Sequence, residues 1–354
     1  MRRLLVVLLL AATLGFLGRG GLPCDAIGVQ PRCYVGLYPG PTADTLTIVE
    51  LSGADVSRST GQLLLTTVSV DSELSLAEWV RATLSPSVRT VDRELIFPAG
   101  TATEDVRAQN AAMMDESQLI ATIAGLRGAG LEFDTDTDGS EVVEVADYSA
   151  ALGILKPGDV LVRGNGDAIR SNADLGRVLS TLGVGDTVEV EVVRAGIRHT
   201  LTVPMVAAPD TGDPVIGVTV RTWLDLPVAV HIDAGVVGGP SAGMMFALAI
   251  VDQLTPADLT NGQVIAGTGE IDVNGLVGRI GGIQQKILGA MNRQDGGDPA
   301  TVFLVPAGNL EEALGTPVHG SILLVPITTL HDAVLALGEM AAGRQPLGAT
   351  ALTG

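Results

Sequence analysis

Residues 238–243 read Gly-Gly-Pro-Ser-Ala-Gly and run directly into Met244–Leu254, which is apolar on nearly every side. Such a run predicts a buried helix with Ser241 at its amino end. The amino end of a helix offers backbone N–H groups without partners and the positive pole of the helix dipole, and an oxyanion requires both. The small residues around the serine, Gly239 among them, let a substrate backbone approach closely. Ser241 is therefore a candidate nucleophile, and an ordinary N-cap serine is the alternative.

A serine hydroxyl needs a neighbouring base before it attacks a carbonyl, and the sequence offers two candidates. His231 lies ten residues before Ser241, but no GxSxG or GDSGG surrounds the serine, and a lone histidine at the end of an apolar strand is more often structural. Lys286 lies in the predicted helix 281–291, on its apolar side. A lysine buried there becomes neutral near pH 7 and can then accept a proton. A lysine that reaches solvent from the edge of that side is the alternative.

Three separated stretches together resemble the proteolytic domain of Lon proteases in content, order and spacing. They are GGPSAG at 238–243, GTGEIDVNGLVGRIGGIQQK at 267–286 and VFLVPAGN at 302–309. The resemblance implies a Ser-Lys dyad whose nucleophile falls on Ser241 and whose base falls on Lys286. The family threonine that holds the lysine amine falls on Thr268. The chain departs from the family in having Gly238 where an acidic residue often stands and in lacking the ATPase module of Lon.

The N-terminus carries two arginines followed by the uncharged apolar run Leu4–Leu17. This run is shorter than the roughly 20 residues that span a bilayer, which leaves an uncleaved membrane anchor and a cleaved signal peptide both open. Both place the rest of the chain outside the cytoplasmic membrane, and a buried helix of a cytosolic domain is the third possibility. Cys24 and Cys33 are the two cysteines of the chain. In an oxidising compartment they can close a small disulfide loop, although two free thiols remain open.

Residues 128–208 resemble a PDZ domain of the kind attached to bacterial envelope proteases. The resemblance rests on predicted strands, a predicted helix and the stretch LKPGDVLVRGNG at 155–166. It implies a groove that takes an extended peptide as an added strand. A membrane segment, a PDZ domain and a Lon-type domain in this order resemble an exported bacterial protease family, as do YVGLYPGP at 34–41 and MMDESQ at 113–118.

Charge and motif content exclude several other functions. The chain has 40 acidic and 21 basic side chains and a formal charge of -19, which repels a phosphate backbone, so we expect no nucleic-acid partner. Its two lysines, Lys156 and Lys286, do not follow a glycine, so no P-loop is present and we expect no ATP. Neither HExxH nor CxxC occurs, so we expect no metal and no other cofactor.

The sequence therefore predicts an α+β multidomain protein. Its predicted parts are a membrane segment at 1–22, a mixed α/β extracytoplasmic region at 23–127, a PDZ-like β-domain with helices at 128–208 and a Lon-type proteolytic α/β domain at 213–345. The predicted function is a membrane-anchored, ATP-independent serine endopeptidase that cleaves unstructured segments of envelope or exported proteins. The alternative is a catalytically inactive scaffold whose PDZ domain binds protein tails. Peptides in the PDZ groove are the expected partners, and a homo-oligomer is left open.

Overall fold

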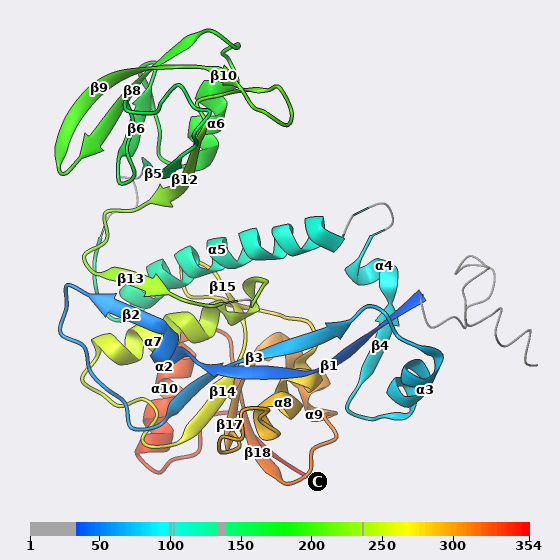
Figure 1. The fold of residues 1–354 in the computed structure, drawn as a ribbon. Helices are drawn as coiled ribbons and strands as arrows, with labels where there is room; N and C mark the ends of the chain where they lie inside the picture. Colours follow the sequence, from blue (N-terminus) through cyan, green and yellow to red (C-terminus); the bar gives the residue numbers. More distant parts are fainter. Residues whose placement is uncertain (1–32, 99–100, 102, 134–138, 236) are drawn as a thin grey trace, which may run out of the picture. The chain divides into compact units, whose positions relative to one another are not determined.

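The computed structural model describes residues 33–98, 101, 103–133, 139–235 and 237–354 (Figure 1). The chain divides into two compact units. The larger unit combines the part of the chain up to Leu131 with the part from Val228 onward, and the smaller unit comprises residues 132–227. The smaller unit is thus inserted into the sequence of the larger one.

One seven-stranded sheet forms the centre of the larger unit. Its strands are β1 (Tyr34–Asp44), β3 (Gln62–Asp71), β4 (Arg89–Asp92), β14 (Val264–Gly267), β17 (Val302–Pro306), β18 (Ser321–Ile327) and β19 (Thr350–Thr353). They lie in the order β19-β18-β17-β14-β3-β1-β4. Strand β14 is parallel to both β3 and β17, and β18 is parallel to β17. Because β3 precedes the inserted unit and β14 follows it, this sheet joins the two parts of the chain.

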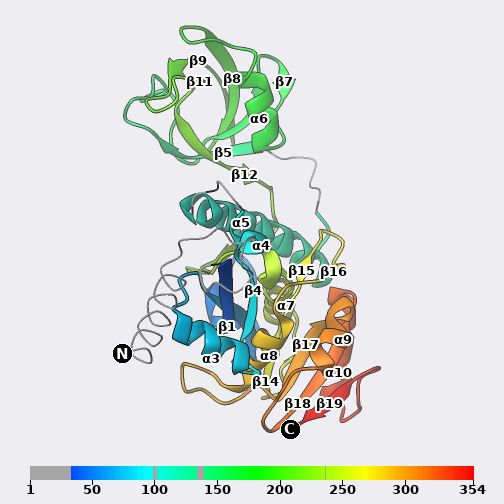
Figure 2. The ribbon, with the colours of Figure 1, turned by 90° about the vertical axis from the view of Figure 1, so that its right-hand side faces the viewer.

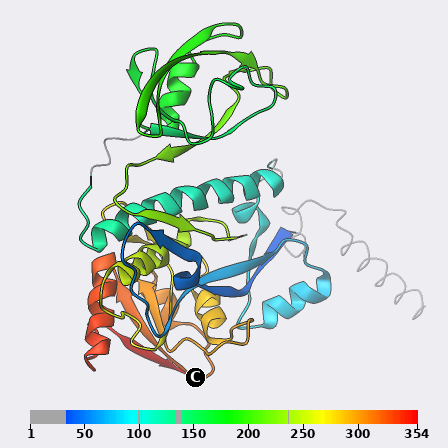
Figure 3. The same ribbon diagram turned by 60° about the vertical axis from the view of Figure 1, so that its left-hand side comes forward.

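Helices and short strands surround this sheet. They are α2 (Thr45–Ile48), β2 (Val49–Ser52), α3 (Leu76–Leu84), α4 (Arg93–Ile96), α5 (Thr103–Gly128), β13 (Ala229–Ile232), η2 (Pro240–Ala242), α7 (Gly243–Leu254), β15 (Glu270–Ile271), β16 (Val277–Gly278), α8 (Ile283–Met291), η3 (Ala307–Asn309), α9 (Leu310–Leu314) and α10 (Leu330–Ala341). Helix α8 shares a core with the sheet, in which Ile283 and Ile287 pack with Leu64 and Phe303. Helix α7 is the buried helix that its composition predicts, since the side chains from Gly243 to Gln253 are buried. Figure 2 and Figure 3 both show α5 lying over α7.

The smaller unit is a β-domain with one helix packed on it. Its elements are β5 (Gly139–Val145), β6 (Val160–Gly164), β7 (Asp167–Ala168), α6 (Asn172–Leu179), β8 (Thr187–Arg194), β9 (Ile197–Pro204), β10 (Val206–Ala207), β11 (Pro214–Val215) and β12 (Val218–Trp223). The main sheet has the order β12-β5-β6-β8-β9, with β7 beside β6. The turn before β6 is closed by the buried carboxylate of Asp159, which accepts from the N–H of Lys156 and pairs with both Nε and Nη2 of Arg194 at 2.6 Å.

The fold class differs from the sequence prediction. The predicted fold class includes a membrane segment, and it has to be corrected to a mixed α/β protein, because no helix in the described part of the chain is long and apolar enough to cross a membrane. The predicted segment at 1–22 itself lies outside the described residues. The range 23–127 contributes three strands to the central sheet, and β12, beyond residue 208, belongs to the smaller unit. A linear pattern of residues carries no signal for such long-range strand pairing.

Candidate active site

Ser241 lies in the short helix η2, which leads directly into α7. The preceding Gly239 has φ +85, a conformation that favours glycine because it carries no Cβ. The N–H of Gly239 donates to the carbonyl of Asn110 at 2.9 Å, and the hydroxyl of Ser117 donates to the carbonyl of Pro240 at 3.1 Å. Both partners come from α5. This helix therefore holds the backbone on the amino side of the serine.

The carbonyl of Ser241 is held from the other side. It accepts from the N–H of Gly269 at 2.8 Å and from the hydroxyl of Thr268 at 2.9 Å. Thr268 follows β14, so the sheet fixes its position. The hydrogen of its hydroxyl is committed to the Ser241 carbonyl, and its oxygen is left to accept.

Lys286 brings the site together from α8, where its side chain is only 3% exposed. Its Nζ is 2.9 Å from the Oγ of Ser241, 2.9 Å from the Oγ1 of Thr268 and 2.9 Å from the main-chain oxygen of Thr66 on β3. Burial disfavours the charged ammonium and lowers the pKa of Lys286 from 10.5 to about 7. Near neutral pH the amine is therefore neutral in a large fraction of the molecules.

The hydrogen bonds around the neutral amine define where its lone pair points. A neutral lysine has two N–H donors and one lone pair. The carbonyl of Thr66 can only accept, and the hydroxyl oxygen of Thr268 accepts because its hydrogen is used elsewhere. With both N–H groups donated to these oxygens, the lone pair faces the hydroxyl of Ser241. This arrangement is what a base needs to remove the serine proton.

The structure brings three of the four predicted site residues into direct contact, namely Ser241, Lys286 and Thr268, and places Gly239 two residues before the serine. The alternative base, His231, lies exposed on β13, where its register partner is Glu50 of β2.

Sequence reasoning missed the contributions of the region before the inserted unit. Thr66 acts through its main-chain carbonyl, so its residue type carried no signal. Asn110 also acts through its carbonyl, whereas Ser117 acts through its side chain. Ser117 lies in the stretch MMDESQ at 113–118, which is part of the resemblance to the exported protease family.

Comparison with known proteins matches two families to the chain. Residues 128–205 match the family model of the PDZ domain, and residues 185–336 match that of the Lon protease (S16) C-terminal proteolytic domain. The chain contains a PDZ domain and a Lon-type proteolytic domain. The Lon-type domain is a serine peptidase domain, and the structure shows that it also uses β1, β3 and α5, which lie before the matched range. The PDZ domain corresponds to the smaller unit and suggests peptide binding.

Three curated relatives are similar to parts of the chain. Lon protease 1 of Sorangium cellulosum is 37% identical over 113 residues, which cover 30% of this chain and 13% of that protein. Lon protease of Neorickettsia sennetsu is 30% identical over 122 residues, which cover 33% and 14%. A probable periplasmic serine endoprotease DegP-like of Pseudomonas savastanoi pv. phaseolicola is 44% identical over 66 residues, which cover 19% and 14%. The chain thus spans only about a seventh of the length of these relatives.

Removing the Thr268 hydroxyl should slow a peptidase that uses this site. Thr268→Val keeps the shape of the side chain but removes one acceptor of the Lys286 amine, so we expect kcat/KM to fall about 10- to 100-fold. Thr268→Ser keeps the hydroxyl and should stay within a few-fold of the wild type. Cleavage of a fluorogenic peptide by the three proteins measures both effects. Equal rates for the valine and serine variants would show that the hydroxyl does not orient the amine.

Proposed function

We propose that the chain is an ATP-independent serine endopeptidase that works through a Ser241–Lys286 dyad. The observation that carries the proposal is the buried amine of Lys286, 2.9 Å from the Ser241 hydroxyl, with its pKa lowered to about 7. Lys286 takes the serine proton as Oγ attacks the scissile carbonyl, and it then delivers that proton to the leaving amine. In the second half of the reaction it takes a proton from the water that releases the acyl group.

The developing oxyanion forms next to the start of η2 and α7, where helix N–H groups and the helix dipole favour negative charge. The N–H of Gly239 already donates to Asn110, and Pro240 has no N–H. The N–H groups of Gly243 and Met244 also donate to carbonyls, those of Pro240 and Gly269. We therefore assign the oxyanion to the N–H groups of Ser241 and Ala242.

Unstructured polypeptide segments are the proposed substrates. Unfolding a stable domain costs about 5–15 kcal/mol, and this chain contains no P-loop through which ATP would supply that energy. The PDZ domain can hold an extended tail on the outer edge of β12, which ends the sheet order of the smaller unit. Holding a tail on the same chain as Ser241 raises its effective concentration at the peptidase site.

Location outside the cytoplasm is a further part of the proposal. Cys33 is disulfide-bonded, and disulfides persist in oxidising compartments. Cys24, its predicted partner, lies outside the described residues. Thiol alkylation of the protein in intact cells tests this point, because two reactive cysteines would contradict it.

The energy requirement provides the test of the function. The purified full chain should cleave a disordered model protein without nucleotide and leave a stable, tightly folded protein intact, and ATP should change neither rate. The Ser241→Ala protein, purified in the same way, controls for contaminating proteases and ATPases. If ATP stimulates degradation several-fold in the wild type and not in this control, the ATP-independent mode has to be abandoned.

A further inference from the structure

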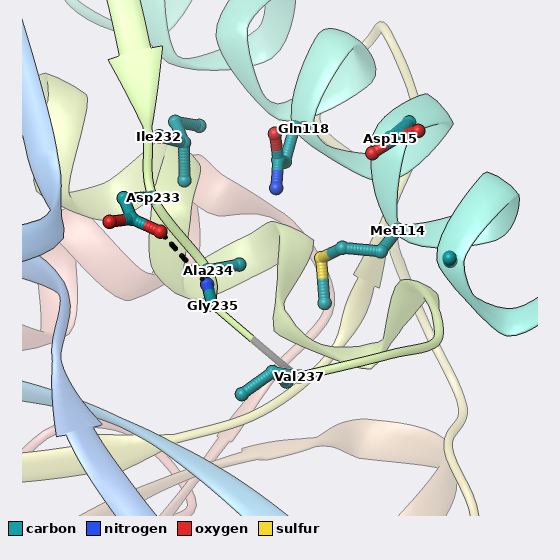
Figure 4. Close-up of a pocket in the computed structure, with 9 residues that line it drawn as sticks. Met114, Asp115, Gln118, Ile232, Asp233, Ala234, Gly235 and Val237 are labelled. Carbon is teal, nitrogen blue, oxygen red and sulfur yellow. Dashed lines mark hydrogen bonds between the residues drawn. The ribbon is translucent and has the colours of Figure 1, made fainter. Parts of the chain in front are cut away.

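A cavity of about 230 Å³ lies between α5 and the loop that follows β13 (Figure 4). Met114 and Gln118 extend from α5 toward the loop, and Ile232 and Val237 close the opposite side. The cavity is smaller than the roughly 300–1,000 Å³ typical of sites for drug-sized ligands, so its size suits a single side chain.

The cavity adjoins the proposed nucleophile along the chain. Val237 lies four residues before Ser241, and the residues between them are the ones that α5 holds through Asn110 and Ser117. Asn110, Met114 and Ser117 are spaced four and three residues apart, so they lie on one face of the helix. The residue that lines the cavity and those that fix the backbone before Ser241 are thus neighbours on α5. The cavity therefore lies beside the backbone that directly precedes Ser241.

The lining of the cavity combines buried apolar side chains with exposed acidic ones. Met114 and Ile232 are 3% and 8% exposed and form the apolar part. Asp115 is exposed, and Asp233, also exposed, accepts from the N–H of Gly235 at 3.0 Å through one oxygen. None of the described lining residues is basic. A long aliphatic stem that ends in a positive charge matches this combination, and lysine and arginine side chains have that form.

We propose that this cavity is the subsite that selects a lysine or arginine side chain close to the scissile bond, with Asp115 as the residue that determines the specificity. The proposal rests on the proposed peptidase function of Ser241. In this proposal Met114 and Ile232 pack against the aliphatic stem, and the Asp115 carboxylate attracts the charged end. An acidic side chain is excluded by like-charge repulsion.

A positional library of internally quenched peptides tests the subsite. We expect one position near the cleaved bond at which the full-length wild type prefers lysine or arginine over leucine. Relative to a leucine substrate measured with the same variant, Asp115→Asn should lower kcat/KM for the basic substrate about fivefold, and Asp115→Lys should lower it about 30-fold. Glu116→Gln is the matched control, because Glu116 is the next residue on α5, is also exposed and is not among the lining residues. An unchanged basic preference in Asp115→Lys, or the same loss in Glu116→Gln, would overturn the subsite.

A binding measurement separates the subsite from the peptidase function. The full-length Ser241→Ala protein is titrated with fluorescent lysine-containing peptides whose C-termini are amidated, so that the PDZ domain has no free carboxylate to recognise. Adding Asp115→Lys should weaken this binding about tenfold or more. Loss of binding upon Asp115→Lys, together with a wild type that cleaves nothing, would support the subsite and refute the proposed function. Cleavage without any dependence on Asp115 would refute the subsite and leave the function standing.

Discussion

Ser241→Ala and Lys286→Arg are each expected to abolish peptide cleavage, lowering kcat by about 10⁴-fold or more. The alanine variant loses the attacking oxygen. Arginine stays protonated at any accessible pH, so it has no lone pair to take the serine proton. The two replacements should cost about the same, because a nucleophile and its base act as one unit. Cleavage of a fluorogenic peptide, followed to product by mass spectrometry, measures the loss.

Folding and pH dependence are the controls for this result. Lys286→Met, which has a similar shape and no charge, separates loss of the base from disruption by a bulkier side chain, and circular dichroism reports on the fold of all three variants. In the wild type, kcat/KM should rise with pH through about 7, because the base must be neutral and the pKa of Lys286 is about 7. A folded Lys286→Arg protein with near-normal turnover would refute the dyad, and a folded wild type without any cleavage would favour an inactive scaffold.

The stability of the larger unit should depend on pH through Lys286. In the unfolded chain a lysine keeps its proton up to about pH 10.4, whereas in the folded protein burial lowers its pKa to about 7. Between these values the unfolded state binds more protons, so the free energy of unfolding rises with pH. The shift of the Lys286 pKa from 10.5 to about 7 corresponds to a loss of about 5 kcal/mol in the free energy of unfolding. The whole of this loss is present below pH 7, and it disappears above the pKa of lysine in the unfolded chain.

Lys286→Met isolates this contribution. At pH 7 the methionine variant should be about 2 kcal/mol more stable than the wild type, because the unpaired carbonyl of Thr66 offsets part of the gain. The difference should shrink and reverse as the pH approaches 10. Urea unfolding at several pH values measures it, with Trp79 as the probe of the larger unit in a Trp223→Phe background that silences the smaller unit. Parallel pH profiles for the two proteins would mean that Lys286 keeps its charge in the site.

The parts of the site that the sequence could predict depend on side chains in local patterns. The apolar composition of α7 predicts a buried helix directly after Ser241. The spacing of apolar residues around Lys286 predicts that this lysine is buried. The resemblance to Lon proteases added Thr268. The remaining parts depend on contacts that no local pattern contains: the carbonyl of Thr66 belongs to any residue type, and the pairing of β3 with β14 spans the inserted unit. The apolar run at the N-terminus led to the prediction of a membrane segment. The hydropathy of a run gives its length and its apolar character, and these two properties alone do not establish that it crosses a membrane.

The pairing of β3 with β14 also has a consequence for the order of folding during synthesis. The strands of the PDZ domain pair within residues 139–223, so this domain has all its partners while the chain is still growing. Strand β3 cannot pair with β14 until β14 has been synthesised. Likewise, the carbonyl of Thr66 cannot accept the hydrogen bond from Lys286 until that residue, 220 positions later, has been added. Contacts this distant in sequence form late, because loop closure has to precede them. The PDZ domain can thus complete its fold before Lys286 is added to the chain, and the proposed dyad of Ser241 and Lys286 forms only afterwards.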